Sequence, residues 1–189
     1  MIDLASGLPD LTAFPRGAWL RAEREVLATA TAQQLGYAPP EGTVELRREL
    51  SAWLARSRGV VAPPEHIIVT GGVAGAFSLV AQVLRDDGFP LAIEDPCAEG
   101  SRRLMRHWLG ELTPIGVDGE GIDVERLAES PAHAVLVTPA HQYPTGVVLS
   151  PERRRQLVSW ARDDGNLVIE DDYDAEYRVA TLVRVPTKQ

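Results

Sequence analysis

Five carboxylates fall within seven positions near the C-terminal end of this 189-residue chain, in the stretch NLVIEDDYDAEYR: Glu170, Asp171, Asp172, Asp174 and Glu176. A short apolar run precedes them, so the acids begin where a buried strand would end. This composition suits a solvated turn, a Mg²⁺ site built from adjacent acids, or one wall of a cofactor pocket. The stretch alone leaves all three readings open.

Asp171 and Tyr173 are the two members of this stretch best placed for chemistry. They lie two positions apart, so in a continuing strand both side chains point to the same side. A carboxylate beside a phenol can hold a protonated heterocyclic nitrogen and the hydroxyl next to it. Asp174 and Glu176 are interpreted as a charged strand end.

Three further polar turns follow apolar runs: TGGVAG at 70–75, EDPCAEG at 94–100 and TPAHQYPTG at 138–146. Paired glycines between a strand and a helix let backbone N–H groups face an anion such as phosphate. TGGVAG lacks the Lys and Ser/Thr of a P-loop, so a plain tight turn is an equal alternative. His141 and Tyr143 in the third turn have neither zinc-site spacing nor a catalytic triad motif around them.

Alternating strands and helices must position these turns. Strands are predicted within residues 66–72, 90–96, 111–115, 133–139 and 166–172. Helices are predicted within residues 16–34, 44–58, 74–86, 100–109, 123–130 and 150–165. This alternation predicts an α/β fold whose mostly parallel sheet carries helices on both faces, preceded by an N-terminal helical arm. Ligands bind at the carboxyl ends of such strands, so we expect all four turns to converge on one edge.

Bulk composition restricts the class of protein. The formal net charge of −8 makes the chain a poor nucleic-acid binder, because phosphate neutralisation dominates that affinity. No apolar run approaches the ~20 residues that a membrane span needs, and the N-terminus lacks the features of a signal peptide. The single cysteine, Cys97, fits a cytoplasmic location. We therefore expect neither nucleic acid nor a membrane as a partner.

Taken together, these segments resemble fold-type-I pyridoxal-phosphate enzymes of the class I/II aminotransferases, and in particular the aminotransferase-like domain of MocR-type regulators. The resemblance covers residues 2–178 and rests on these motifs in family order: GLPDLTAFPRGAWLR, LGYAPPEGTVELRRELSAWLARSRGV, IIVTGG, EDP, TPAHQYPTGVVLS and VIEDDYDAEYR. It implies the large-domain part of the aminotransferase fold, with pyridoxal phosphate as cofactor. The implied division is an arm with helices at 1–60, an incomplete cofactor-domain core at 61–178 and a divergent tail at 179–189.

The resemblance assigns roles around the cofactor. Three successive residues would bind its phosphate through backbone amides and the helix dipole: Gly72, Val73 and Ala74. Asp171 would pair with the pyridinium nitrogen and keep it protonated, so that the ring acts as an electron sink. Tyr173 would donate to the phenolic oxygen of the ring, and Tyr143, with His141 and Gln142 nearby, would line the face or edge of the ring.

The resemblance also implies contacts beyond the cofactor. Gly7 and Leu8 would border the pocket of a small amino-acid-like ligand, and Tyr37 would reach toward a neighbouring subunit. The expected partner is a second copy in a homodimer or a complementing C-terminal polypeptide.

The chain departs from the family pattern at several positions. Ala74 replaces a usual glutamine, and Ala98 replaces the aromatic that stacks on the cofactor ring, with Glu99 beside it. The Schiff-base lysine of the family lies in a later Ser/Thr-rich motif, but after Arg178 the resemblance stops, and Lys188 lacks that motif. We therefore expect no catalytic lysine in this chain, and cofactor binding that is noncovalent or lost.

Three hypotheses follow. The first is an incomplete aminotransferase-type domain that is not a competent transaminase on its own. The second is a lysine-less pseudoenzyme that serves as a ligand-binding or dimerisation module. The third, a Mg²⁺-dependent phosphotransfer domain using Asp171 and Asp172, leaves TPAHQYPTG and the N-terminal arm without a role.

Overall fold

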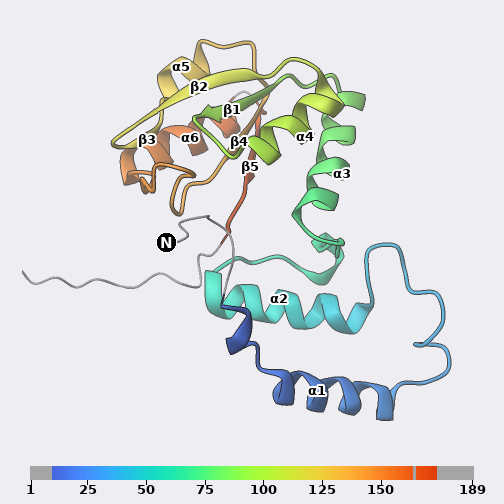
Figure 1. Cartoon of the computed structure of the whole chain (residues 1–189). Coiled ribbons are helices and arrows are strands. Elements are labelled where there is room, and N and C mark those ends of the chain that lie inside the picture. The colour runs from blue at the N-terminus through green and yellow to red at the C-terminus, as the bar shows by residue number, and fades with distance from the viewer. Residues whose placement is uncertain (1–9, 164, 174–189) are drawn as a thin grey trace, which may run out of the picture. The chain divides into compact units, whose positions relative to one another are not determined.

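The computed structural model describes residues 10–163 and 165–173. The chain divides into two compact units, Met1–Val69 and Thr70–Gln189 (Figure 1). The described residues of the first unit, from residue 10 onward, form helices and connecting segments, and the second unit holds the sheet with its helices. The sequence-based boundary after residue 60 stays a prediction.

The first unit is built on two helices joined by an irregular segment. Its elements are η1 (Leu11–Ala13), α1 (Arg16–Thr29), α2 (Val44–Arg58) and η2 (Pro64–His66). Thr43 caps α2 by accepting a hydrogen bond from the Leu46 N–H, and Gly59 ends it in the left-handed conformation at φ 66°. The prediction for this helix is confirmed, whereas the first helix ends at Thr29, five residues earlier than the predicted limit of 34.

The second unit contains a five-stranded sheet in the order β3-β2-β1-β4-β5. Its strands are β1 (Leu91–Asp95), β2 (Thr113–Asp118), β3 (Gly121–Ile122), β4 (Ala134–Val137) and β5 (Leu167–Glu170). β1 pairs in parallel with β2 and β4, and β4 pairs in parallel with β5; only β3 is antiparallel, to β2. The predicted mostly parallel sheet is confirmed.

Helices cover both faces of this sheet (Figure 1). They are α3 (Val73–Asp86), α4 (Glu99–Leu109), α5 (Val124–Ala128) and α6 (Pro151–Asp163). Successive β4 residues enter different cores: Leu136 packs in the cluster containing α3 and α4 residues, and Val137 in the cluster containing α5 and α6 residues. A fully buried strand with apolar side chains on both faces is what places the sheet between two helical layers.

One predicted strand is absent from the structure, and one observed strand was not predicted. Residues 66–72 form no strand: η2 ends at His66, and the segment then runs without sheet pairing to α3. An apolar run becomes a strand only where another strand pairs with it, and this run has no such neighbour among the described residues. The short strand β3 was not predicted, because two residues carry no periodic signal.

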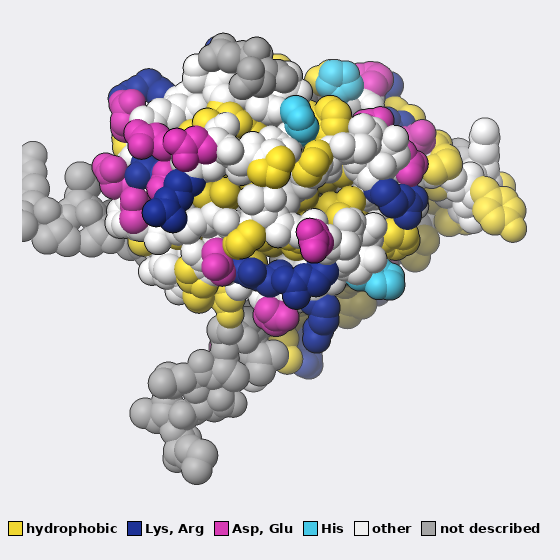
Figure 2. Space-filling model, turned by 90° about the horizontal axis from the view of Figure 1, so that it is seen from above, with side chains coloured by type: hydrophobic (Ala, Val, Ile, Leu, Met, Phe, Trp, Pro, Cys, Tyr) yellow, Lys and Arg dark blue, Asp and Glu magenta, His cyan; other side chains and the backbone are white. Residues whose placement is uncertain are grey.

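No helix within the described ranges is long and apolar enough to cross a lipid bilayer. On the face shown in Figure 2, basic and acidic side chains are interleaved rather than gathered into one basic area. The expectation that nucleic acid is not a partner stays a prediction.

Candidate functional site

Three of the four polar turns lie at one edge of the sheet. β1, β4 and β5 are adjacent and parallel, so the segments that follow them leave from the same side. The Asp171 N–H donates to the Val137 carbonyl at 2.9 Å, which continues the β4–β5 pairing by one residue. The fourth turn, residues 70–75, leads into α3 without a preceding strand.

A buried carboxylate joins the end of β1 to the loop after β4. Glu94 is 3% exposed, and its Oε2 accepts hydrogen bonds from Thr138 N at 3.1 Å, Thr138 Oγ1 at 2.7 Å and Gln142 Nε2 at 3.2 Å. Burial raises the pKa of Glu94, while the hydrogen bonds from Thr138 and Gln142 oppose that rise. The carboxylate of Glu94 therefore binds two residues that lie 44 and 48 positions later in the sequence, Thr138 and Gln142.

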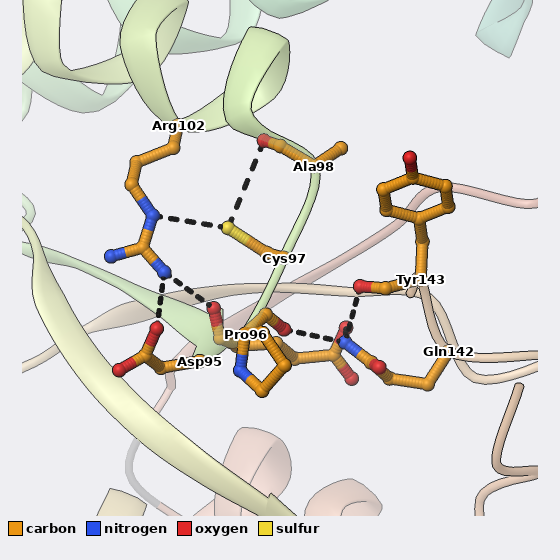
Figure 3. A network of polar contacts seen from close by, with 8 residues as sticks. Asp95, Pro96, Cys97, Ala98, Arg102, Gln142 and Tyr143 are labelled. Carbon is orange, nitrogen blue, oxygen red and sulfur yellow. Dashed lines mark hydrogen bonds and ion pairs between the residues drawn. The ribbon is translucent and has the colours of Figure 1, made fainter. Parts of the chain in front are cut away.

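The Gln142 side chain is the centre of this arrangement and is 2% exposed. Its Nε2 lies 2.7 Å from the carbonyls of Pro96 and Tyr143 and 3.2 Å from Glu94 Oε2, so its two N–H groups serve three acceptors and one of them is shared (Figure 3). Its Oε1 accepts from Thr145 N at 3.2 Å and from Thr145 Oγ1 at 2.7 Å. The amide thus binds the turn after β1 and the loop after β4 at once.

Glu94 is not among the site residues expected from the sequence, and Gln142 is expected there only as a neighbour of Tyr143 beside the cofactor ring. The available signal for Glu94 was an acid directly after the apolar run LAI of a predicted strand. Such a residue is buried only when partners are supplied for it. The sequence did not predict that Gln142, among the polar residues of TPAHQYPTG, is buried and contacts Glu94 and Pro96.

The turn after β1 is held from its other side by α4. The Arg102 guanidinium donates to Asp95 Oδ1 at 2.6 Å, to the Glu94 carbonyl at 3.3 Å and to Cys97 Sγ at 3.3 Å (Figure 3). Burial raises the pKa of the Cys97 thiol, and Arg102 opposes this. Ala98, predicted to replace a ring-stacking aromatic, is the partly buried N-cap residue of α4.

Three of the residues that were predicted to contact the cofactor ring have aromatic side chains that meet in the structure: His141, Tyr143 and Tyr173. The His141 and Tyr173 rings meet edge to face with centroids 4.5 Å apart, and the Tyr143 and Tyr173 rings do so at 6.4 Å. The Tyr173 hydroxyl donates to the His141 carbonyl at 2.7 Å. That bond uses the only proton of the hydroxyl, so donation to a ligand would require this bond to be exchanged.

Asp171 directly follows the last residue of β5 and is half-buried. Burial raises the pKa of Asp171, and the charge of Asp172 raises it further. No hydrogen bond or ion pair reaches the Asp171 carboxylate from residues 10–163 or 165–173. A carboxylate in this setting is suited to a cationic partner, which would relieve the cost of its burial.

The remaining predicted residues lie elsewhere. Gly72, with φ 113°, is the N-cap of the 14-residue helix α3, and Val73 and Ala74 form its exposed first turn. Tyr37 belongs to the first unit, is fully exposed and lines an open hollow of about 390 Å³. Gly7 and Leu8 lie outside the described residues.

Across the described part of the chain, no three His, Cys, Asp or Glu side chains are grouped as metal ligands. Asp171 and Asp172, the described acids after β5, therefore belong to no group of three possible metal ligands among the described residues. The Mg²⁺ hypothesis gains no support from their geometry.

Residues 1–174 match the family described as aminotransferase class I and II. The chain is 34% identical over 188 residues to the HTH-type pyridoxine biosynthesis transcriptional regulator PdxR of Corynebacterium glutamicum, covering 100% of this chain and 40% of that protein. It is similar to the crystal structure of an archaeal alanine:glyoxylate aminotransferase, with a TM-score of 0.78 and 31% identity. That match covers 88% of this chain and 43% of the aminotransferase.

A second solved structure is LysN, the alpha-aminoadipate aminotransferase of Thermus thermophilus, complexed with N-(5'-phosphopyridoxyl)-L-leucine. The TM-score is 0.74 at 27% identity, and the match covers 89% of this chain and 43% of that one. The chain thus spans less than half the length of these relatives. The resemblance derived from the sequence motifs is confirmed.

Proposed function

The chain belongs to the aminotransferase class I and II family, and on that premise we propose that its second unit binds pyridoxal phosphate noncovalently at the carboxyl ends of β1, β4 and β5. This is the edge at which ligands bind in parallel α/β sheets. The LysN structure, which carries a phosphopyridoxyl compound, supports this choice of ligand.

The single observation that carries the proposal is the state of Asp171. Its carboxylate is half-buried, its pKa is raised by burial and by Asp172, and no cation among the described residues pairs with it. A protonated pyridine nitrogen would supply the missing positive charge. When bound, the cofactor supplies an electron sink for chemistry at the α-carbon of an amino acid.

The other residues would hold the remaining parts of the cofactor. The aromatic group of His141, Tyr143 and Tyr173 would line the ring. The exposed first turn of α3, which begins directly after Gly72, would hold the phosphate through backbone N–H groups that make no bond within the helix. Ala98 offers no ring to stack on the pyridine, so we expect weaker binding than with an aromatic at that position.

The only lysine in the sequence is Lys188, which lacks the family motif. We therefore propose that these 189 residues hold the cofactor without covalent attachment and do not transaminate by themselves. Transamination needs an amine nucleophile that also carries a proton. Contacts of Gly7, Leu8 and Tyr37 with a substrate or a second polypeptide stay predictions.

A second candidate is a ligand-binding module without turnover. It is favoured by the match along the whole chain to a transcriptional regulator, at 34% identity. Both candidates use the same cofactor site. They differ in whether a lysine outside these 189 residues completes the chemistry.

The experiment is a titration of the purified chain with pyridoxal phosphate, followed by equilibrium dialysis and by quenching of tryptophan fluorescence. The test variant is Asp171→Asn, and the matched control is Asp172→Asn on the exposed neighbouring residue. We expect loss of the charge pair at Asp171 to weaken binding about tenfold, and the control to change it less than about twofold. Absence of binding to the wild-type chain, or equal weakening by both variants, would contradict the proposal.

Attachment is tested separately by borohydride reduction and mass spectrometry. We expect the protein mass to stay unchanged after reduction in the presence of cofactor. A mass increase that disappears in Lys188→Arg would show covalent attachment and overturn the noncovalent assignment.

A further inference from the structure

Glu94 and Gln142 form a buried polar pair that joins the turn after β1 to the loop after β4. We propose that they are a positioning pair: Gln142 sets the spacing of these two segments, and Glu94, as a hydrogen-bond acceptor, sets the orientation of the Gln142 amide. The identity of the ligand that the segments hold, pyridoxal phosphate, rests on the proposed function.

The surroundings of Gln142 permit one orientation of its amide. Its Nε2 faces three acceptors, namely Glu94 Oε2 and the carbonyls of Pro96 and Tyr143. Its Oε1 faces two donors, both from Thr145. The oxygen and nitrogen of an amide are nearly identical in shape, so hydrogen bonding decides between the two orientations. A flipped amide would set oxygen against three acceptors and NH₂ against two donors.

The amide nitrogen connects two segments that carry predicted cofactor contacts. Pro96 lies in the turn that leads through Cys97 to Ala98, and Tyr143 carries one of the three rings of the aromatic group. Arg102 holds the same turn from the α4 side through Asp95 and Cys97, opposite Gln142 (Figure 3). The turn after β1 is therefore fixed on both sides, and removing the Gln142 contact frees one of them.

Glu94 contributes through one oxygen. All three hydrogen bonds reach Oε2, and Oε1 receives none from the described residues. An uncharged carbonyl oxygen at the place of Oε2 can accept the same three bonds. The role that we assign to Glu94 therefore requires an acceptor at this point and does not require the negative charge.

This distinction gives a pair of matched variants. Glu94→Gln keeps an acceptor of the same shape, and Glu94→Met keeps the length of the side chain but removes the acceptor. A second pair of variants changes a donor to the oxygen of the Gln142 amide. Thr145→Val removes the hydroxyl that donates to Gln142 Oε1, and Thr145→Ser keeps it. Thr145 is exposed, so we expect both variants to fold.

Two readouts are made on the full chain: hydrogen exchange of residues 94–98 and 138–146 without cofactor, and the dissociation constant for pyridoxal phosphate. For Thr145→Val, which loses the one hydrogen bond from Oγ1 to Gln142 Oε1, we expect faster exchange in both segments and about tenfold weaker binding. For Glu94→Met, which loses all three bonds to Oε2, we expect changes in the same direction that are at least as large. For Glu94→Gln and Thr145→Ser we expect exchange as in the wild type and binding within about threefold of it.

Rescue by the conservative variants is the readout that general destabilisation would not produce. If Glu94→Gln loses as much affinity and protection as Glu94→Met, the charge is what matters and the acceptor role is wrong. Unchanged exchange in both Glu94→Met and Thr145→Val would also overturn the proposal. If the wild-type chain binds no pyridoxal phosphate, the proposed function fails, and the exchange experiment still decides the positioning role.

Discussion

The Tyr173 hydroxyl donates a hydrogen bond to the His141 carbonyl at 2.7 Å, and the two rings meet edge to face. These residues are 32 positions apart, and the parallel pairing of β4 with β5 brings the segments that carry them to one edge of the sheet. The segment after β5 is thereby attached to the loop after β4. Asp171, two residues before Tyr173, is held between the strand pairing and this contact.

Tyr173→Phe tests this attachment. The variant keeps the ring contact with His141 and loses the hydrogen bond, so the free energy of unfolding should fall by about 1 kcal/mol. Tyr173→Leu also removes the edge-to-face contact, which adds about 0.5–1.5 kcal/mol of destabilisation. Urea unfolding of both variants measures the difference; equal stability of Tyr173→Phe and wild type would show that the hydroxyl does not stabilise the loop.

The raised pKa of Glu94 predicts a pH dependence of stability. The folded chain keeps the Glu94 proton to a higher pH than the unfolded chain, whose carboxyl has its ordinary value of 4.5. The folded state then binds more protons in the window above 4.5, so the Glu94 contribution to stability is lost as pH rises through its pKa.

The measurement is the difference in unfolding free energy between wild type and Glu94→Gln from pH 4.5 upward to about neutral pH, a range that starts at that ordinary value. The free energy of unfolding of the wild type should rise relative to that of Glu94→Gln as pH falls. Burial also raises the pKa of Asp171, but that residue is present in both proteins and cancels in the difference. A difference that stays constant with pH would show that Glu94 does not titrate in this window.

Arg153 should stabilise the second unit far more than its neighbour Arg154. Its guanidinium donates to the Ile122 carbonyl at 2.7 Å and to Asp118 Oδ2 at 2.9 Å, and its side chain is 16% exposed. Arg153→Met leaves that carbonyl without this donor and should cost about 1–3 kcal/mol. Arg154 is exposed, so Arg154→Met should change stability by less than about 0.5 kcal/mol. Thermal unfolding compares the two, and equal losses would contradict the assignment.

Gly121 is predicted to tolerate no side chain. Its φ is +108°, and an added Cβ would lie 2.5 Å from Leu149 Cδ1 and 3.2 Å from Leu149 Cα. Gly121→Ala should therefore cost more than about 2 kcal/mol, from backbone strain together with the clash. Gly88 also has a positive φ but open space around it, so Gly88→Ala should cost only about 1 kcal/mol. Chemical denaturation of both variants separates the clash from the strain.

Much of the fold was predictable because it depends on local patterns. The helix at Val44–Arg58 has the bounds that the sequence predicts, because apolar residues recur along it at helical spacing. The buried strand at Ala134–Val137 is an uninterrupted apolar run. Residues 66–72 show the limit of this reasoning: the run HIIVTGG has strand composition, but the described residues provide no pairing neighbour.

The sequence by itself determined the family, the order of the helices and of the strands β1, β2, β4 and β5, and the location of Asp171, Tyr143 and Tyr173 in turns that follow strands. Motif order, side-chain periodicity and helix end signals are properties of neighbouring residues, so they can be read without coordinates.

Only the tertiary structure decided which polar residues are buried and what they bind. Glu94 meets Thr138 and Gln142 across 44 and 48 positions because β1 and β4 are adjacent in the sheet. A buried hydrogen bond depends on distance and direction in space, and no pattern along the chain specifies either.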